Sequence, residues 1–221
     1  MSSGETRPVL VLVGPPGAGK TTVGEMLAHR LGVAFTDVDS VCEQRAGKTI
    51  AEVFVEDGED AFRALEREVV ADLLTGTDGV LALGGGSVLA AETRARLRGH
   101  RVAHLTVGLA DGLRRTGMST ARPLLAGVNP RATFKALLDA RAPLYREVAT
   151  VEIDTVGASA REVTRAVLTA FGLEPVVPEQ PEDSPETGGA GSGTGPASSF
   201  DEPAEPAVPA PVALPDPTLR P

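Results

Sequence analysis

The fold is indicated most directly by the stretch Gly14-Pro15-Pro16-Gly17-Ala18-Gly19-Lys20-Thr21. Its spacing fits G-x-x-x-x-G-K-[ST], the pattern of a loop whose backbone N–H groups surround phosphate oxygens. The apolar run Val9–Val13 before it predicts a buried strand, and Thr22–Leu31 after it has apolar residues at helical spacing. A strand, a glycine loop and a helix follow in the order that phosphate binding requires, because the helix N-terminus adds partial positive charge there. The stretch therefore predicts a P-loop of an α/β fold.

Further apolar runs along the chain extend this pattern into a sheet. Helical patterns separate the runs, an alternation typical of a parallel sheet with helices on both faces. The predicted strands are Val9–Val13, Ala34–Thr36, Val80–Leu83, Arg101–Val107 and Val151–Asp154.

Helix boundaries are marked by capping residues. Capping boxes at Thr49–Glu52 and Ser159–Glu162 each predict a helix start, and Gly172 is expected to end the last helix. A long helix is predicted from Glu59 to Leu74. Asn129-Pro130 is predicted to begin another, which we expect to end before Pro143.

The chain divides by composition near residue 174. Residues 174–221 hold 12 of the 18 prolines and few large apolar side chains, so we expect a disordered, acidic, Pro/Gly-rich tail. The tail accounts for −8 of the net charge of −9, and residues 1–173, predicted to be one domain, are therefore near −1.

Charge and composition also exclude several classes of function. The near-neutral domain and the seven aromatic residues of the chain argue against nucleic acid as a partner. Cys42 is the only cysteine, which excludes an internal disulfide, and we expect it to be a buried apolar side chain. The sequence has no apolar leader and no run near 20 apolar residues, so a soluble cytoplasmic protein without membrane contact is expected.

Special residues follow three of the predicted strands, where the ligands of parallel α/β sheets bind. The P-loop follows the first, Asp37-Val38-Asp39 the second and Gly84-Gly85-Gly86 the third. If the Asp pair is extended, both carboxylates face the P-loop, one near Mg²⁺ and one near an acceptor hydroxyl. The alternative is an acidic turn that caps the next helix. The glycines favour close approach of a ligand to backbone N–H groups over a merely flexible turn.

Arginines in three segments complete the set. Arg63 lies on the predicted long helix, Arg141 precedes Pro143, and Arg122 lies in residues 116–128, which have no apolar periodicity and are predicted to form a mobile lid. Each arginine taken alone is as consistent with a solvated surface charge.

In this order and combination the motifs resemble the shikimate kinase family over about Val9 to Leu173. The motifs are the P-loop continued by Thr21-Thr22-Val23-Gly24, Asp37-x-Asp39, Asp57-Gly58-Glu59, Phe62-Arg63-x-x-Glu66, Leu83-Gly84-Gly85-Gly86, Arg122-Pro123-Leu124-Leu125 and Arg141-x-Pro143-Leu144-Tyr145.

The resemblance implies a fold, an activity and a set of roles. The fold is a three-layer, five-stranded parallel sheet of order 2-3-1-4-5, and the activity is transfer of the ATP γ-phosphate to the shikimate 3-hydroxyl in aromatic amino acid biosynthesis. The implied ATP ligands are Gly17, Ala18, Gly19, Lys20, Thr21, Thr22, Arg115 against adenine, and Arg122 from the lid. The implied Mg²⁺ partners are Thr21 and, through water, Asp37. The implied shikimate ligands are Asp39, Arg63, Gly84, Gly85, Gly86 and Arg141, and the implied catalytic residues are Lys20, Asp39 and Arg122. The family also implies a monomer.

The chain departs from the resemblance in one loop. Family members often carry an arginine after the last strand, against adenine, whereas Val156-Gly157-Ala158-Ser159-Ala160 has none. Adenine contacts from this loop are therefore expected to be apolar or from the backbone.

Two other functions remain open at this point. Another small-molecule P-loop kinase, such as a gluconate kinase, would share the P-loop and the lid, whereas Asp39, Arg63, Gly84–Gly86 and Arg141 favour an acceptor with a carboxylate and hydroxyls. A nucleotide-dependent switch or an adaptor that uses the acidic tail is the non-enzymatic alternative, although no Asn-Lys-x-Asp guanine motif is present.

Overall fold

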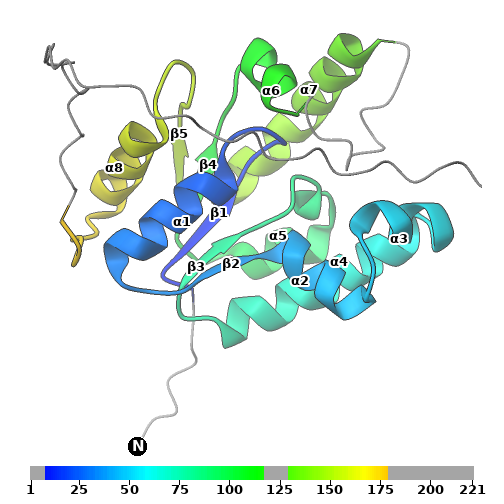
Figure 1. Ribbon diagram of the computed structural model, residues 1–221, viewed down its shortest axis with the longest axis horizontal. Coiled ribbons are helices and arrows are strands. Elements are labelled where there is room, and N and C mark those ends of the chain that lie inside the picture. The colour runs from blue at the N-terminus through cyan, green and yellow to red at the C-terminus, as the bar shows by residue number, and fades with distance from the viewer. Residues whose placement is uncertain (1–7, 117–128, 179–221) are drawn as a thin grey trace, which may run out of the picture. The chain divides into compact units, whose positions relative to one another are not determined.

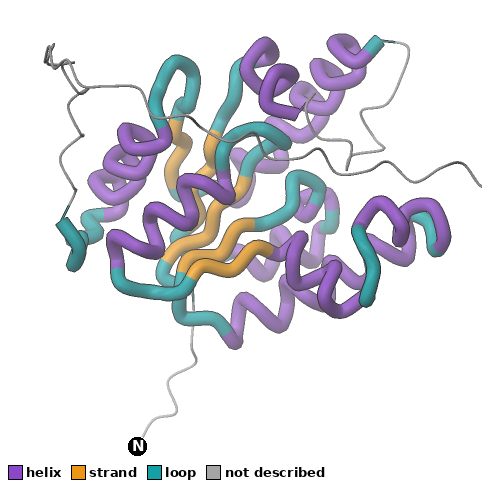
Figure 2. Tube along the Cα trace, in the orientation of Figure 1, coloured by secondary structure: helices purple, strands orange, loops and turns teal. Residues whose placement is uncertain are grey.

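The structure is a computed structural model that describes residues 8–116 and 129–178. A parallel sheet of five strands forms its centre, in the order β2-β3-β1-β4-β5 (Figure 2). The strands are β1 (Leu10–Val13), β2 (Phe35–Asp37), β3 (Val80–Ala82), β4 (Val102–Leu105) and β5 (Val151–Ile153). The predicted α/β class and strand order are confirmed, and each predicted strand coincides with an observed one.

Helices cover both faces of this sheet (Figure 1). One face is covered by α1 and α8, which pack against each other, and the opposite face by α4, α5 and α7. The helices are α1 (Lys20–Leu31), α2 (Val38–Ala46), α3 (Ile50–Glu56), α4 (Glu59–Gly76), the 3₁₀ turn η1 (Ser87–Leu89), α5 (Ala91–Leu97), α6 (Leu109–Thr116), α7 (Pro130–Val148) and α8 (Ala160–Phe171).

The central strand β1 divides its side chains between two cores. Successive side chains of a strand point to opposite faces. Leu10 and Leu12 therefore pack in the core under α1 and α8, and Val11 and Val13 pack in the core under α4 and α7. All four are fully buried, which is why this run is apolar throughout instead of alternating.

The predicted helix caps are confirmed. Thr49 and Ser159 each form a complete capping box, with Glu52 and Glu162 respectively. Asn129 accepts a hydrogen bond from the Ala132 N–H at the start of α7, and Gly172 ends α8 in the left-handed conformation with φ 58°. These helix ends depend on the capping residues themselves, so they can be predicted from the sequence.

The predicted end of α7 before Pro143 is wrong, because the helix continues through the proline to Val148. A proline inside a helix removes one backbone hydrogen bond and crowds the carbonyl four residues earlier, here that of the exposed Asp139. Pro143 itself lies on the exposed side of α7, whereas Tyr145 is buried in the core. Burial of the second half of the helix therefore outweighs the local cost of the proline.

The described chain continues a few residues past the domain boundary predicted at residue 174. The Val176 and Val177 N–H groups donate to the Arg30 carbonyl over 2.9 and 3.1 Å, and Arg30 Nε donates to the Val177 carbonyl over 2.8 Å. The described chain thus continues to residue 178 and is held at the C-terminal end of α1. Residues 179–221 of the predicted tail lie outside the described part, as do residues 117–128 of the predicted lid.

None of the helices in the two described ranges is both long and apolar enough to cross a membrane.

Candidate active site

The P-loop connects β1 to α1 at the carboxyl edge of the sheet. Gly14, Gly17 and Gly19 all have positive φ, and a side chain at Gly14 would collide with the Leu105 carbonyl. Gly19 stands at the N-cap of α1, so no side chain occupies the first N–H groups of that helix. The loop therefore leaves its backbone donors and the positive end of the helix for an anion.

Two cavities adjoin this loop, and Arg115 lines both. The first, of about 200 Å³, is lined by Gly17, Gly19, Lys20, Thr21, Thr22, Arg115 and Thr116. Lys20 Nζ lies over the loop and donates to the Gly14 and Pro15 carbonyls at 2.9 and 3.2 Å. An ammonium, a hydroxyl and uncapped N–H groups in one concave site are suited to a polyphosphate.

The second cavity, of about 210 Å³, is more apolar and suits a flat ring. It is lined by Ala18, Gly19, Thr22, Val23, Arg115, Thr155, Ala158, Ala160 and Val163. Arg115 Nη1 donates to the Gly17 carbonyl at 3.2 Å, which fixes the guanidinium between the two cavities. Thr155 and Ala158 come from the loop after β5, so this loop reaches the cavity without an arginine.

Asp37 joins the P-loop to the second strand. Its Oδ2 accepts a hydrogen bond from Thr21 Oγ1 at 3.0 Å, while its Oδ1 accepts one from the Asp39 N–H at 3.0 Å as the N-cap of α2. Of the two arrangements considered for the pair, the extended one is not adopted, because α2 begins at Val38. Asp37 both caps α2, as the alternative proposed, and lies against the P-loop, because each of its two carboxylate oxygens makes one of these contacts.

Asp39 in the first turn of α2 faces the glycine segment after β3. A Cβ built on Gly84 would lie 2.5 Å from Asp39 Oδ1 and 2.8 Å from Glu66 Oε1. Only glycine therefore allows both carboxylates this close to the backbone. The sequence suggested that the glycines leave space for a ligand, but beside Gly84 part of that space is occupied by the carboxylates of Asp39 and Glu66.

Arg63 on α4 reaches the same segment. Its guanidinium packs against Gly86, where a Cβ would collide with it. Nη1 pairs with Glu66 Oε2 at 2.6 Å and Nη2 with Glu59 Oε1 at 3.3 Å, and the group lies 5.2 Å from the Phe62 ring centroid. The side chain is only 16% exposed, so it is held in place and is not a solvated surface charge.

Arg141 on α7 approaches the glycines from another side. Its Nη1 donates to the Gly85 carbonyl at 3.0 Å. A Cβ on Gly85 would lie 2.9 Å from Pro16 Cδ, so the P-loop is in contact with this segment as well. Three side chains from three helices, those of Asp39, Arg63 and Arg141, thus meet at Gly84–Gly86 beside the phosphate loop.

Comparisons with known proteins agree with this arrangement. A family model described as shikimate kinase matches residues 16–171. The chain belongs to the shikimate kinase family. A shikimate kinase of Saccharopolyspora erythraea is 67% identical over 150 residues, which cover 68% of this chain and 86% of that protein, and one of Thermobifida fusca is 59% identical over 150 residues, covering 68% and 87%.

A solved shikimate kinase has the same fold. The structure of the Acinetobacter baumannii enzyme, in complex with shikimate, superposes with a TM-score of 0.71 at 42% sequence identity, covering 75% of this chain and 93% of that one. The P-loop fold with a parallel sheet of order 2-3-1-4-5 is therefore common to this chain and to the shikimate kinases.

Two side chains at this site, Glu66 and Tyr145, appeared in the sequence motifs but were not among the candidate site residues. Glu66 is 3% exposed and joins Arg63 to the turn after β3, because its Oε1 accepts from Ser87 Oγ at 2.6 Å. The spacing of Arg63 and Glu66 on one helix was a usable signal, since residues three apart lie on the same face. Tyr145, whose hydroxyl donates to the Gly85 carbonyl, ends the motif Arg141-x-Pro143-Leu144-Tyr145, but the motif did not indicate this contact.

Two further predictions concern the lid with Arg122 and the Mg²⁺ ligands. Arg122 and the rest of the predicted lid after Thr116 belong to the residues that the structure does not describe. Within the described ranges, no group of three or more His, Cys, Asp or Glu side chains is arranged to hold a metal ion.

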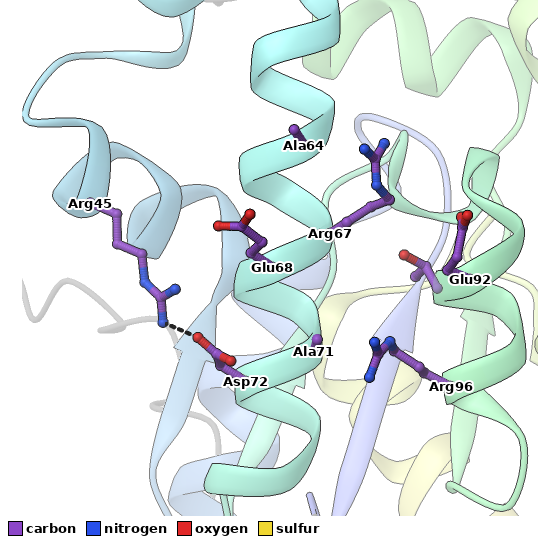
Figure 3. A pocket seen from close by; sticks show the side chains of 9 residues that line it. Arg45, Ala64, Arg67, Glu68, Ala71, Asp72, Glu92 and Arg96 are labelled. Atoms are coloured by element: carbon purple, nitrogen blue, oxygen red, sulfur yellow. Dashed lines mark ion pairs between the residues drawn. The ribbon is translucent and has the colours of Figure 1, made fainter.

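A more voluminous groove lies away from the P-loop, between α4 and α5 (Figure 3). Its charged lining residues are of both signs, and Arg45 and Asp72 form an ion pair of 2.8 Å across one end. It holds none of the residues of the site and has no excess of either charge. The lining residues are Arg45, Ala64, Arg67, Glu68, Ala71, Asp72, Glu92, Thr93 and Arg96.

Proposed function

We propose that this chain transfers the γ-phosphoryl group of ATP to the 3-hydroxyl of shikimate, giving 3-phosphoshikimate and ADP. One observation carries the proposal: Arg63, Arg141 and Asp39 meet at a glycine segment that touches Pro16 of the P-loop. Two guanidinium groups and a carboxylate beside the P-loop support an acceptor that carries both a carboxylate and hydroxyls. Membership of the shikimate kinase family supports the same acceptor.

On the nucleotide side, the P-loop N–H groups and Lys20 hold the phosphates. Gly17, Ala18, Gly19 and Thr22 surround the phosphate chain, and Arg115 with the apolar cavity accepts the adenine. The Thr21 hydroxyl and the Asp37 carboxylate, 3.0 Å apart, are hard oxygen donors of the kind that Mg²⁺ prefers, so they fit this ion. When bound, Mg²⁺ neutralises charge that develops on the β- and γ-phosphates.

On the acceptor side, Arg63 and Arg141 bind the shikimate carboxylate. Planar guanidinium groups suit a carboxylate because they can form two parallel hydrogen bonds. The N–H groups of Gly84–Gly86 add donors, and Asp39 accepts a hydrogen bond from the reacting hydroxyl. These contacts hold the hydroxyl oxygen in line with the γ-phosphorus.

Positioning is the main requirement of this reaction. The transferred phosphoryl group is only loosely bonded in the transition state, so a strong base is not needed. As the oxygen–phosphorus bond forms, the hydroxyl proton passes to Asp39, and the bond to the ADP oxygen breaks. Arg122 is proposed to reach the phosphates from residues 117–128 and to stabilise the charge on the equatorial oxygens.

We further propose that the enzyme is a monomer and acts in the cytoplasm, with residues 1–178 as the kinase domain. Size-exclusion chromatography with light scattering tests the oligomeric state. A mass of one chain is expected, and a mass of two chains would contradict the proposal.

A substrate panel tests the proposed reaction. ADP release is measured with ATP and Mg²⁺ in the presence of shikimate or of gluconate, and Lys20→Ala serves as the control for contaminating kinases. We expect turnover with shikimate that the control abolishes. Turnover with gluconate and none with shikimate would replace the proposed acceptor, and no acceptor-dependent turnover would favour a non-enzymatic role.

A further inference from the structure

The carbonyl of Gly85 is held by two donors from α7. Tyr145 Oη donates to it at 2.5 Å and Arg141 Nη1 donates to it at 3.0 Å. A carbonyl oxygen has two lone pairs, so both are used. Tyr145 is only 1% exposed, and its hydroxyl therefore cannot exchange this acceptor for bulk water.

Fixing this oxygen also fixes the next N–H group. The Gly85–Gly86 peptide is planar and trans, as no cis peptide bond occurs in the described chain, so the Gly86 N–H points away from the Gly85 oxygen. The oxygen faces α7, and the N–H therefore points to the other side. Neither the Gly85 nor the Gly86 N–H has an acceptor among the described residues, so both donors are left for a ligand.

The Tyr145 side chain is itself held from the sheet. Its ring stacks on that of His104 in β4, with centroids 4.9 Å apart and planes 24° apart. His104 Nδ1 in turn lies 3.0 Å from Glu152 Oε2 in β5. The ring of Tyr145 is thus held by packing against the sheet, while its hydroxyl contacts the glycine segment.

We infer that Tyr145 is a positioning residue for the acceptor substrate: its hydroxyl orients the Gly85–Gly86 peptide so that this segment and Arg141 bind the acceptor carboxylate together. The inference rests on the proposed function, because it assumes that Arg141 and the glycines form the acceptor site. The hydroxyl of Tyr145 donates to Gly85, in the segment proposed to bind the acceptor, so we expect its removal to act on acceptor binding.

Tyr145→Phe removes the hydroxyl and keeps the ring that stacks on His104. With only one donor left on the Gly85 carbonyl, we expect the shikimate KM to rise about 3- to 10-fold, the range for one hydrogen bond. The ATP KM and kcat are expected to stay within about twofold, because the nucleotide contacts are unchanged. Steady-state kinetics with each substrate varied in turn measures this split.

Thr164→Val is the matched control. Thr164 is also fully buried and donates its hydroxyl to a backbone carbonyl, that of Ala160 at 2.8 Å, but it lies on α8. Thr164→Val should lower the melting temperature about as much as Tyr145→Phe does and leave the shikimate KM unchanged. If it raises that KM equally, general loosening explains the effect and the inference is wrong.

Arg141→Ala separates this inference from the proposed function. If Arg141→Ala leaves the shikimate KM unchanged, the acceptor site itself is misplaced. If Arg141→Ala raises the shikimate KM and Tyr145→Phe does not, only the role of Tyr145 is overturned. The same holds if Tyr145→Phe raises the ATP KM as much as it raises the shikimate KM.

The wild-type chain offers a second readout should the variant fail to fold. Tyr145 is the single tyrosine and there is no tryptophan, so the tyrosine emission of the protein comes from this residue alone. Saturating shikimate is expected to change that emission, because the ligand binds the peptide to which the phenol donates. An emission unchanged at saturating shikimate would contradict the inference.

Discussion

At the scale of single residues, Asp37 links the start of α2 to the P-loop through its two carboxylate oxygens. One oxygen caps α2 and the other accepts a hydrogen bond from Thr21 at the P-loop. The two roles can be separated, because asparagine is also a good N-cap but has no charge with which to attract Mg²⁺.

We therefore predict different results for two substitutions of Asp37. Asp37→Asn should keep the thermal stability and raise the Mg²⁺ concentration needed for half-maximal activity. Asp37→Ala should raise the Mg²⁺ requirement similarly and also cost about 1 kcal/mol of unfolding free energy through loss of the cap. Thermal unfolding and Mg²⁺ titrations of turnover measure both effects. Equal melting temperatures for the two variants would contradict the capping role.

Cys42 gives a second prediction at this scale. It is 1% exposed, and burial, assisted by the nearby carboxylates of Glu66 and Asp39, raises the pKa of its thiol to about 12. The reactive thiolate is therefore nearly absent at pH 8. We expect the folded protein not to react with a thiol reagent over the time in which the denatured protein is fully labelled. Rapid labelling of the folded protein would show that the residue is accessible.

The sequence motifs predicted which residues lie together at the candidate site. Asp39, Arg63 and Arg141 were predicted and do meet in the structure, and the buried thiol was expected too. Tyr145 could not be found in the same way, because its role depends on a carbonyl 60 positions earlier in the chain. Contacts of this kind arise from the fold and leave no local pattern.

At the scale of elements, α1 contains a glycine in its interior that helix propensity alone would disfavour. A Cβ on Gly24 would lie 2.9 Å from Phe35 Cδ2 and closer still to Cε2, so glycine lets α1 pack against β2. Gly76, in the last turn of α4, has nothing within 4 Å of the corresponding position.

The same substitution should thus have opposite effects in these two helices. Gly24→Ala is expected to destabilise the protein by about 1–3 kcal/mol, because the ring must move in a packed core. Gly76→Ala is expected to stabilise it by up to about 1 kcal/mol, since it restricts the unfolded chain at no steric cost. Chemical denaturation of both variants measures the difference. A stabilising Gly24→Ala would refute the packing argument.

Element boundaries were predictable where a cap determines them and less so where packing does. The ends at Thr49, Asn129, Ser159 and Gly172 follow from their own side chains or backbone conformation. Pro143 carries a strong local signal for a helix end, yet α7 continues, because the buried Tyr145 beyond it belongs to the core. For the Asp37–Asp39 pair the sequence left an extended turn and a helix cap open, and the structure has the cap, with Asp37 at the start of α2.

At the scale of the whole molecule, the order of the strands assembles the site. β2, β3 and β1 are neighbours, so Asp37, the glycines after β3 and the P-loop emerge side by side at one edge of the sheet. α4 and α7 then bring Arg63 and Arg141 to this edge from the opposite face to α1. The alternation of strands and helices in the sequence was enough to predict this edge, whereas the side-chain pairings on it required the coordinates.

The extent of the folded unit gives a prediction at this scale. A chain that ends at residue 178 keeps the three hydrogen bonds between Arg30 and residues 176–177, and a chain that ends at residue 173 loses them. We expect both to retain kcat within about twofold, because the P-loop lies at the other end of α1. The shorter chain should be less stable by about 1–3 kcal/mol. Equal stability of the two chains would show that these contacts contribute nothing.

Arginines from two distant helices, α4 and α7, are proposed to bind one acceptor beside the P-loop. A double-mutant cycle of Arg63→Ala and Arg141→Ala, with shikimate affinity measured by isothermal titration calorimetry, tests this proposal most directly. Each single substitution is expected to weaken binding by about 2–5 kcal/mol. The double substitution should cost less than the sum by at least about 0.5 kcal/mol, because both groups hold the same carboxylate. Shikimate affinity that neither substitution alters, or strictly additive losses, would contradict the shared acceptor site.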